Sequence, residues 1–527
     1  MRACQIKYWT ENPSMRMRNT GLHSFTVAIA AASLMTGAST LAQPRYGAVG
    51  DLYQEVCSAC HGAALEGTAL GTPLVGAELV GGDSTEALQN SIRVGNPEAE
   101  MPAYDGVLEP DQIQSLAIFI LEQRQGYTYD HYGVRAQIGI PGGVQNSEHH
   151  DFVLEPLIED LAPLPYSIAP LPDGRLLLTE KKRGLSFISA DGHQSEVVPG
   201  TPRVYGDSTI PDGPRALDRG LGWMHEAALH PEFEENGWIY LYYGDRCEGC
   251  NEVSRERNAP VSMTRIYRGR IRDGAWIDEA TIWRSAYEHY TPGTDLSLGG
   301  RIAFDDDGHV YFSVGAKNGF YDLGIQDLST PWGKIHRVSE DGSIPPDNPF
   351  VGVEGAIESI WTLGHRVPQG LSYDPATDRL WSTEHGARGG DEINLIEGGR
   401  NYGWPLVTSG VHYDGSSIVD LFEVEFDWGE MQPPVVDLIP SPALTAIVVY
   451  RGDAFPGWDG DLIAGSLKAN SLFRFSIGED GTVERETLVD GIGRIRDVAV
   501  DSQGRLLLLI EHASGGKILR LGPPQGG

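Results

Sequence analysis

The sequence predicts a six-bladed all-β propeller preceded by a small all-α domain. Two observations support the β body. The 66 glycines and 33 prolines follow no three-residue period and favour many tight turns, and strand-turn-strand patterns recur after residue 170. Helical periodicity is found before about residue 125, which places the α domain first. A chain of 527 residues has room for two domains.

The charge balance excludes some classes of partner. The chain carries 73 acidic residues against 40 Lys and Arg, a formal charge of −33. Nucleic acids and anionic bilayers are bound by clustered cations, so we expect no nucleic-acid partner. Since 40% of the residues are apolar and 21% are charged, the chain can bury sizeable cores. We therefore expect a soluble globular protein.

The N-terminus has the pattern of an export signal. Basic residues in 15–18 precede an apolar stretch at 25–35 and the small residues of 39–42. This order predicts a signal peptide over 1–42, cut after Ala42, with the true start at Met1, Met15 or Met17. The alternative, a transmembrane anchor, needs a longer apolar run. No second long apolar run follows, so we expect no membrane span in the mature chain and a periplasmic or secreted protein.

The pattern C-x-x-C-H at Cys57, Cys60 and His61 predicts covalently bound haem c. Two thiols on one helical turn can form thioether bonds to haem, and the adjacent histidine can bind iron. Met101, about forty residues later, is the expected second axial ligand, which would close the iron to substrates. A zinc pair would need two further ligands, and a simple disulfide would not explain the histidine.

The region around this motif supports an electron-carrying domain over residues 44–125. We expect one helix to end near Val56 and another to cover Asp111 to Arg124. The second helix has a helical apolar stripe, formed by Ile113, Leu116, Ala117, Ile120 and Leu121. The segment resembles a class I cytochrome c domain along its length. A linker rich in Gly, Pro and His is expected over 126–155.

A second C-x-x-C, Cys247 and Cys250, is not followed by histidine. In an oxidising compartment such a pair in an acidic loop is most often a structural disulfide. A redox-active pair is the alternative, although no thioredoxin-like βαβ pattern surrounds it.

The body over residues 156–527 shows repeated hairpin signatures with Asp/Gly turns between apolar runs. They lie at 171–176, 304–310, 373–380 and 500–506. Their spacings are near multiples of roughly 65 residues, which predicts six four-stranded blades around a channel. Two packed β-sandwiches are the alternative. In a propeller, the loops at one mouth of the channel are expected to carry the chemistry.

Several blocks of this body, taken in order, resemble the soluble glucose/sorbosone dehydrogenases that use pyrroloquinoline quinone (PQQ). The blocks lie at 228–233, 236–240, 299–304, 326–328, 333–335, 341–345, 363–370, 384–386, 390–394, 401–405 and 493–498. The resemblance implies a six-bladed propeller, in agreement with the repeat spacing.

The resemblance also implies a cofactor site. PQQ carries three carboxylates, which suit Lys and the planar guanidinium of Arg. Arg494 and Arg496 alternate on a strand and face one side. By resemblance they bind the cofactor carboxylates together with Lys468, and Arg366 lies beside the quinone. By the same resemblance, the backbone carbonyls of Gly386 and Ala387 would help to hold a calcium ion that polarises the quinone.

The sequence departs from the family where the proton is removed. The family's basic histidine is replaced by Ser297, a family asparagine is Val367, and a family glutamine has no match in 221–223. A serine is not a general base at neutral pH without help. His225, beside Glu226, is the expected replacement base; His289 and His385 are the alternatives.

These inferences predict an exported quinohaemoprotein that oxidises a sugar or another alcohol with PQQ. Electrons would pass to haem c and then to an external cytochrome or terminal oxidase. One alternative is a propeller that has lost its base and acts as a binding or electron-transfer module. Another is oxidation of a different alcohol with a relocated base.

Overall fold

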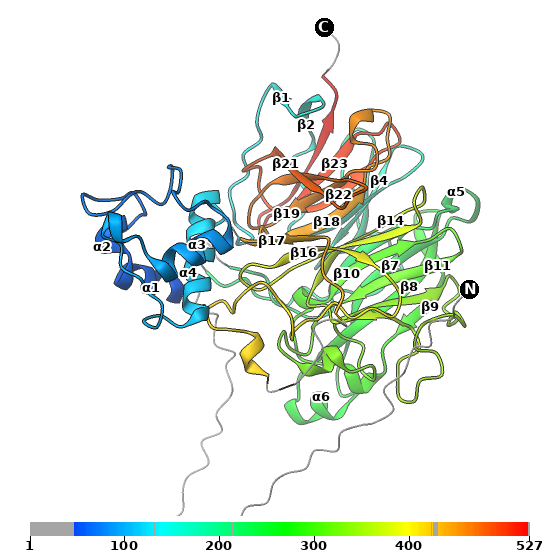
Figure 1. Cartoon of the computed structure of the whole chain (residues 1–527). Coiled ribbons are helices and arrows are strands. Elements are labelled where there is room, and N and C mark those ends of the chain that lie inside the picture. The colour runs from blue at the N-terminus through cyan, green and yellow to red at the C-terminus, as the bar shows by residue number, and fades with distance from the viewer. Residues whose placement is uncertain (1–46, 130–131, 213–215, 423, 425–430, 525–527) are drawn as a thin grey trace, which may run out of the picture. The chain divides into compact units, whose positions relative to one another are not determined.

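In the computed structural model, six antiparallel sheets form a six-bladed propeller that follows a helical domain. The structure describes residues 47–129, 132–212, 216–422, 424 and 431–524. The predicted signal peptide lies outside these residues. Figure 1 colours the chain from the blue helices α1–α4 to the red C-terminal strands. The fold class predicted from the sequence is confirmed.

The helical domain contains four α-helices and one 3₁₀ helix in its described part. They are α1 (Ala48–Val56), α2 (Ser58–His61), α3 (Thr85–Val94), η1 (Pro97–Ala99) and α4 (Pro110–Gln125). A capping box between Glu109 and Gln112 begins α4, and Gly126 in the left-handed region ends it. Helices α1 and α3 pack against α4. The predicted apolar stripe of α4 lies in this core.

The first three blades follow the chain in order. The first sheet holds β3 (Pro165–Pro170), β4 (Leu176–Glu180) and β5 (Gly184–Ile188). The second holds β6 (Met224–Leu229), β7 (Ile239–Cys247), β8 (Val261–Arg272) and β9 (Ala275–Arg284). The third holds β10 (Gly299–Phe304), β11 (His309–Val314), β12 (Lys334–Ser339) and β13 (Ile360–Leu363).

The last three blades complete the ring. The fourth sheet holds β14 (Pro368–Asp374), β15 (Arg379–Glu384), β16 (Asp391–Ile396) and β17 (Val436–Leu438). The fifth holds β18 (Leu444–Val449), β19 (Leu462–Ser466), β20 (Leu472–Ile477) and β21 (Val483–Val489). In the sixth sheet the strands lie side by side in the order β1 (Val144–Asn146), β2 (Asp151–Ile158), β24 (Lys517–Gly522), β23 (Leu506–Ile510) and β22 (Ile495–Val500).

Short helices lie in the connections between strands. They are α5 (Phe233–Asn236), α6 (Glu252–Arg257), η3 (Tyr287–His289), η4 (Asp295–Ser297), η5 (Leu323–Gln326), η6 (Val419–Leu421) and η8 (Pro456–Trp458). Cys247 and Cys250 form the expected disulfide between β7 and α6.

The ring closes by pairing a strand from before the first blade with the C-terminal strand. Neighbouring blades contact each other through one strand of each blade, in the order β3, β6, β10, β14, β18 and β22, and β22 contacts β3 again. Strand β2 pairs with β24, and Figure 1 shows the cyan β1 and β2 beside the red β23. The segment that the sequence assigns to the linker, 126–155, therefore includes β1 and part of β2, the strand that closes the ring. The sequence pattern misses this because the partner of β2 lies more than 350 residues away.

The predicted hairpin turns have a local cause. In the turn after β10, Asp305 accepts hydrogen bonds from the backbone N–H groups of Asp307 and His309, and Gly308 has a φ of +81°. Asp501 accepts in the same way from Gln503 and Arg505. These side chains fix the turn, so the pattern is visible in the sequence.

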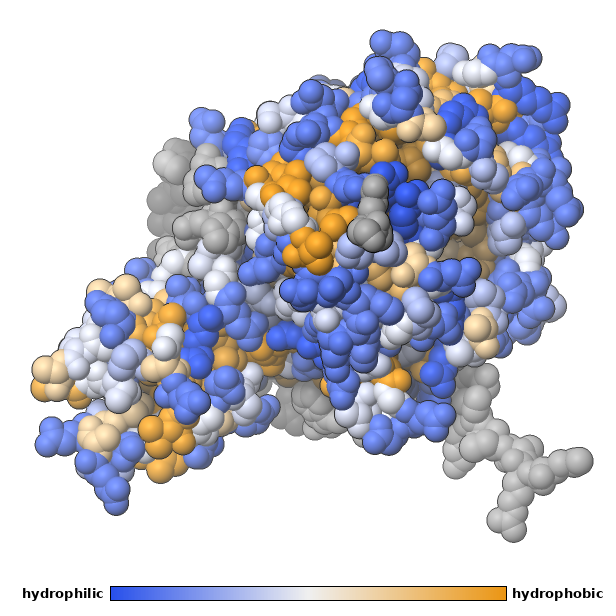
Figure 2. Space-filling model, turned by 90° about the horizontal axis from the view of Figure 1, so that it is seen from above, coloured by the Kyte–Doolittle hydropathy of each residue, from blue (hydrophilic) through white to orange (hydrophobic). Residues whose placement is uncertain are grey.

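The blades bury both faces of their inner strands. All five residues of β4 and all five of β23 are buried, and apolar clusters fill the space between neighbouring sheets. On the face seen in Figure 2, hydrophilic side chains predominate and apolar ones form separate patches. Among the described residues, none of the helices is long and apolar enough to cross a bilayer.

The closing strand gives the first prediction. Phe152 on β2 is fully buried in the core beneath β23, so Phe152→Ala is expected to lower the free energy of unfolding by about 3–5 kcal/mol. Val144 on β1 is 52% exposed, and Val144→Ala should change it by less than about 0.5 kcal/mol. Urea unfolding measures both. Equal effects would mean that β2 does not close the ring.

Candidate functional site

The C-x-x-C-H motif lies on one helical turn and is arranged to hold haem. Cys57 and Cys60 carry unpaired thiols, and burial together with the neighbouring Cys60 raises the pKa of Cys57 to about 11. Nδ1 of His61 lies 2.8 Å from the carbonyl oxygen of Thr72. Because a carbonyl can only accept, Nδ1 carries the proton and the lone pair of Nε2 remains for iron. These residues fit a c-type haem.

Met101 lies in a tight turn after α3. Its N–H and C=O groups exchange hydrogen bonds of 3.0 Å with the backbone of Asn96. Gly95 has a φ of +69°, and a Cβ there would lie 2.6 Å from the Met101 carbonyl oxygen. Glycine is therefore needed for this close approach. The axial role of Met101 stays a prediction.

The mouth of the propeller gathers cations from several blades. In antiparallel hairpins the start of one strand lies beside the end of the next, as in the pairs Ile495 with Ile510 and Pro165 with Glu180. Buried cations occupy these positions in the described structure: Lys181, Arg366, Arg388, Lys468, Arg494 and Arg496. We call them the cation cluster.

Arg494 and Arg496 bind the same carboxylate oxygen. Both donate to Oε2 of Glu511, at 3.0 and 2.6 Å, and Lys181 pairs with Oε1. Burial alone would raise the pKa of Glu511, but Arg496, Lys181 and Arg494 hold it well below its usual value. Burial also lowers the pKa of Lys181 to about 8, together with the two arginines and against the effect of Glu511. Three cations thus share one carboxylate.

Lys468 does not share that carboxylate. Its Nζ lies 2.6 Å from Oε1 of Glu122 on α4, and Oε2 of Glu122 lies 2.6 Å from Nη2 of Arg388. Glu122, Lys468 and Arg388 are each 2% exposed. This second group of the cation cluster thus has two cations and one carboxylate.

Two tyrosines from the segment before β1 connect the two groups. The Tyr129 ring lies 4.0 Å from Nζ of Lys468, and Tyr132 lies 5.3 Å from the Arg494 guanidinium. The two rings meet edge to face at 6.3 Å. The backbone oxygen of Tyr132 accepts a hydrogen bond from Arg494. Lys468 and the arginines therefore border the same pair of side chains.

Arg366 lies at the predicted calcium carbonyls. Its Nη1 donates to the carbonyl oxygens of Gly386 and His385, at 2.6 and 3.1 Å, and Nη2 donates to Tyr413 at 3.1 Å. The Gly386 oxygen is thus already bound by a cation, and calcium requires six or more oxygen ligands. Across the described residues, no group of three His, Cys, Asp or Glu side chains suits a metal ion. Gly386 and Ala387 alone therefore do not provide the oxygen ligands that a calcium ion needs.

The cation cluster does fit a polycarboxylate. Five of the six buried cations are ion-paired with two carboxylates, Glu122 and Glu511, and the sixth, Arg366, donates to neutral oxygens, in a chain whose formal charge is −33. Nε of Arg366, and Nε and Nη1 of Arg388, have no hydrogen-bond partner among the described residues. Buried donors of this kind favour an anionic ligand. The donor set therefore suits a quinone that carries three carboxylates.

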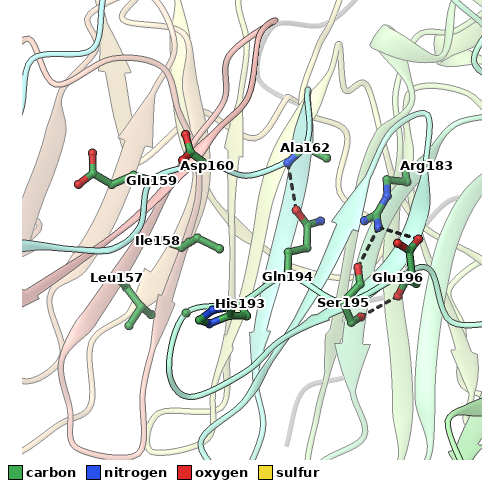
Figure 3. A pocket seen from close by; sticks show the side chains of 11 residues that line it. Leu157, Ile158, Glu159, Asp160, Ala162, Arg183, His193, Gln194, Ser195 and Glu196 are labelled. Carbon is green, nitrogen blue, oxygen red and sulfur yellow. Dashed lines mark hydrogen bonds and ion pairs between the residues drawn. The ribbon is translucent and has the colours of Figure 1, made fainter.

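An open pocket elsewhere has different chemistry. Figure 3 shows it lined by Glu159, Asp160, Arg183, His193 and Glu196, among others. Arg183 donates to the Ser195 carbonyl and pairs with Glu196, and Gln194 accepts from the N–H of Ala162. With three acids against one arginine, this pocket does not suit an anionic cofactor, and it contains none of the predicted site residues.

His225 is buried at the start of β6. Its Nε2 lies 3.1 Å from the Asp295 carbonyl oxygen, so Nε2 carries the proton. Nδ1, which keeps the lone pair, has no hydrogen-bond partner in the described structure. Burial lowers the pKa of His225 to about 4. Glu226 instead pairs with Arg301 and points away, because successive strand residues face opposite sides. Asp295, rather than Glu226, therefore orients the ring.

The other groups that could take the substrate proton lie in different surroundings. His385 is half-buried, and burial together with Arg366, Arg496 and Arg494 lowers its pKa to about 3. It therefore lies beside the cation cluster. His289 on η3 packs edge to face on Trp332 at 5.4 Å. Ser297 on η4 donates its hydroxyl hydrogen to the Thr294 carbonyl at 3.0 Å. Which of these groups takes a proton stays a prediction.

Comparison with known proteins identifies both parts of the chain. Residues 162–520 match the family described as Glucose / Sorbosone dehydrogenase. The chain belongs to this family. Residues 45–120 match the family described as Cytochrome C oxidase, cbb3-type, subunit III. A glucose/sorbosone dehydrogenase propeller thus follows a cytochrome c domain, as the sequence resemblance implied.

Relatives of this family cover most of the propeller. Aldose sugar dehydrogenase YliI of Escherichia coli (strain K12) is 33% identical over 370 residues, or 70% of this chain and 92% of that protein. Quinoprotein glucose dehydrogenase B of Acinetobacter calcoaceticus is 27% identical over 420 residues, or 67% and 84%. The crystal structure of the soluble E. coli aldose sugar dehydrogenase in the apo-form superposes with a TM-score of 0.61 at 30% identity, covering 71% and 99%.

Sequence reasoning missed four groups at the mouth of this family propeller. Lys181 and Glu511 follow β4 and β23 without a motif of their own. Arg388 lies between the family blocks 384–386 and 390–394 and belongs to neither. Glu122 directly follows the apolar run 116–121 of α4, and an acid beside such a run is the signal that could have drawn attention to it.

The haem arrangement yields a second prediction. If Met101 is the axial ligand, Met101→Ala opens the iron and lowers the haem midpoint potential by about 0.1 V or more, because thioether ligation raises it. Potentiometric titration and carbon monoxide binding to the reduced haem measure this. Glu98→Gln, at an exposed residue of η1, is the control. An unchanged potential without carbon monoxide binding would contradict the assignment.

Proposed function

We propose that the chain is an exported quinohaemoprotein that oxidises a sugar or another alcohol with PQQ and passes the electrons to covalent haem c. The carrying observation is the cation cluster at the mouth of a strongly acidic propeller: six buried cations, of which five are ion-paired with only two carboxylates. The family membership and the cytochrome c domain support the same function.

In this proposal the chain's own residues bind, orient and exchange protons. PQQ would supply an acceptor for the hydride of the alcohol carbon, and haem would supply a one-electron acceptor for each of the two electrons, with the remaining proton released to solvent. Lys468, Arg494 and Arg496 bind the cofactor carboxylates, and Arg366 donates hydrogen bonds at the quinone. Nδ1 of His225 accepts the proton.

Joining the haem domain to the propeller has a kinetic reason. A tethered acceptor is present at a high effective concentration, so electrons need not wait for a diffusing partner. Cys57 and Cys60 hold the haem and His61 binds its iron, with Met101 as the proposed second ligand.

The location and final acceptor follow from the same features. The pattern of residues 1–42 and the disulfide between Cys247 and Cys250 both favour an oxidising compartment, the periplasm or the exterior. The electrons would leave to an external cytochrome or terminal oxidase. A formal charge of −33 favours a cationic partner surface.

A second function is favoured by Ser297. Its hydroxyl lies where the family carries a basic histidine and is held by the Thr294 carbonyl. Without a replacement base, the propeller would be a binding or electron-transfer module. With a relocated base, the chain could oxidise an alcohol other than the family's sugars.

The proposed function gives a third prediction. Adding PQQ and an aldose to the haem-loaded protein should reduce the haem, seen as the rise of its absorption near 550 nm. Arg496→Gln removes a charged donor and should weaken PQQ binding about 10- to 100-fold. Arg175→Gln, at an exposed arginine of the first blade, is the control. If no sugar or alcohol reduces the haem, the binding module is favoured.

The base assignment gives a fourth prediction. Since the pKa of His225 is lowered to about 4 by burial, the ring is neutral at pH 7. The rate should be flat above about pH 5 and fall as His225 is protonated below it. His225→Gln should lower kcat about 10²- to 10⁴-fold, while His289→Gln leaves it near wild type. A full rate in His225→Gln, with loss in His385→Gln, would assign the proton to His385.

A further inference from the structure

The helical domain contributes one buried carboxylate, Glu122, which pairs with Lys468, the lysine proposed to bind the cofactor. Glu122 lies on α4, is 2% exposed, and holds Lys468 and Arg388 at 2.6 Å each. Lys468 follows β19, and Arg388 lies between β15 and β16. An uncompensated carboxylate is rarely buried, because the loss of hydration costs several kcal/mol. Glu122 is therefore built to meet these two cations.

Helix α4 has apolar residues on more than one face. Leu116, Ala117 and Ile120 pack in the helical domain's own core. Ile118 is fully buried as well, and its Cδ1 lies 3.3 Å from the position of a Cβ at Gly389. Gln114 donates to the Ser409 carbonyl at 2.9 Å. The side of α4 that carries Glu122 thus contacts the loops next to Arg388 and is not a water-facing helix surface.

The ammonium of Lys468 is enclosed by groups that precede the propeller in the chain. Besides the Glu122 carboxylate, the Tyr129 ring lies 4.0 Å from Nζ. An ammonium between a carboxylate and an aromatic ring is well stabilised. A carboxylate of the quinone would have to reach the same ammonium.

We propose that Glu122 occupies the place of a cofactor carboxylate on Lys468, so that cofactor binding and docking of α4 oppose each other. This rests on the proposed PQQ function. Two anionic groups that compete for one ammonium are linked, and each weakens the other by the same factor.

The test is Glu122→Gln in the full, haem-loaded chain without PQQ. The amide keeps the shape of the side chain and removes its charge. We expect PQQ to bind about tenfold tighter than to wild type, measured by quenching of tryptophan fluorescence, since Lys468 no longer has an anionic competitor. A role in stability alone would weaken binding or leave it unchanged. Glu98→Gln, an exposed acid of the same domain, should bind as wild type does.

Hydrogen exchange of the peptide over 110–129 gives a second measurement that needs no catalysis. In wild type, saturating PQQ should speed its exchange, because the cofactor displaces Glu122 from Lys468. In Glu122→Gln, exchange should be fast with or without PQQ. If that variant does not fold, as judged by circular dichroism and haem absorption, Glu122→Asp replaces it; the carboxylate is then one methylene short of Lys468, and binding should be tighter than wild type.

The outcomes separate this inference from the proposed function. If wild type binds PQQ and Glu122→Gln binds it equally or more weakly, the inference is wrong and the function stands. If only the variant binds PQQ, both are supported, and Glu122 controls loading. If neither protein binds PQQ, the proposed function and the inference are both overturned.

Discussion

The site depends on keeping six cations out of water with few counter-ions. Removing one partner of a buried ion pair costs about 3–5 kcal/mol, so Glu511 is essential for Lys181, Arg494 and Arg496 to share one space. Even so, the cations outnumber the carboxylates paired with them. The structure therefore carries an electrostatic cost that an anionic ligand would relieve, which is how a strongly acidic protein can bind a tricarboxylate.

The propeller explains why these residues meet. The start of the first strand and the end of the second lie together in every blade, and six such ends surround one mouth of the channel. One or two residues at these ends in each of four blades, the first, fourth, fifth and sixth, build the cation cluster. Because the supporting strands are buried on both faces, the backbone at these positions is held rigidly, while the loops beyond remain open to change, as the substitution at Ser297 illustrates.

Local patterns were predictable from the sequence, and long-range closure was not. The Asp305 and Asp501 turns, the haem motif at Cys57 to His61 and the convergence of Arg494 with Arg496 each depend on a few neighbouring residues. Glu511, Lys181 and Glu122 carry no motif, since their partners are 15 to 346 residues away. The sequence assigns residues 151–155 of β2 to the linker because nothing near them in the sequence reveals that the partner of β2 is β24. The family resemblance supplied Lys468, but not the carboxylate that holds it.

Closure of the ring also explains why the cytochrome c domain reaches the cation cluster. Strand β2 must pair with β24, in the sheet that carries Arg494, Arg496 and Glu511. The chain entering this sheet therefore passes the mouth of the channel: the N–H of Ala513, two residues after Glu511, donates to the Val134 carbonyl at 2.7 Å. Tyr132 and Tyr129 precede this point and lie on Arg494 and Lys468. The topology therefore places a domain that precedes β1 beside the cations, where its last helix is held by Glu122 on Lys468 and Arg388 and by the hydrogen bond from Gln114 to the Ser409 carbonyl.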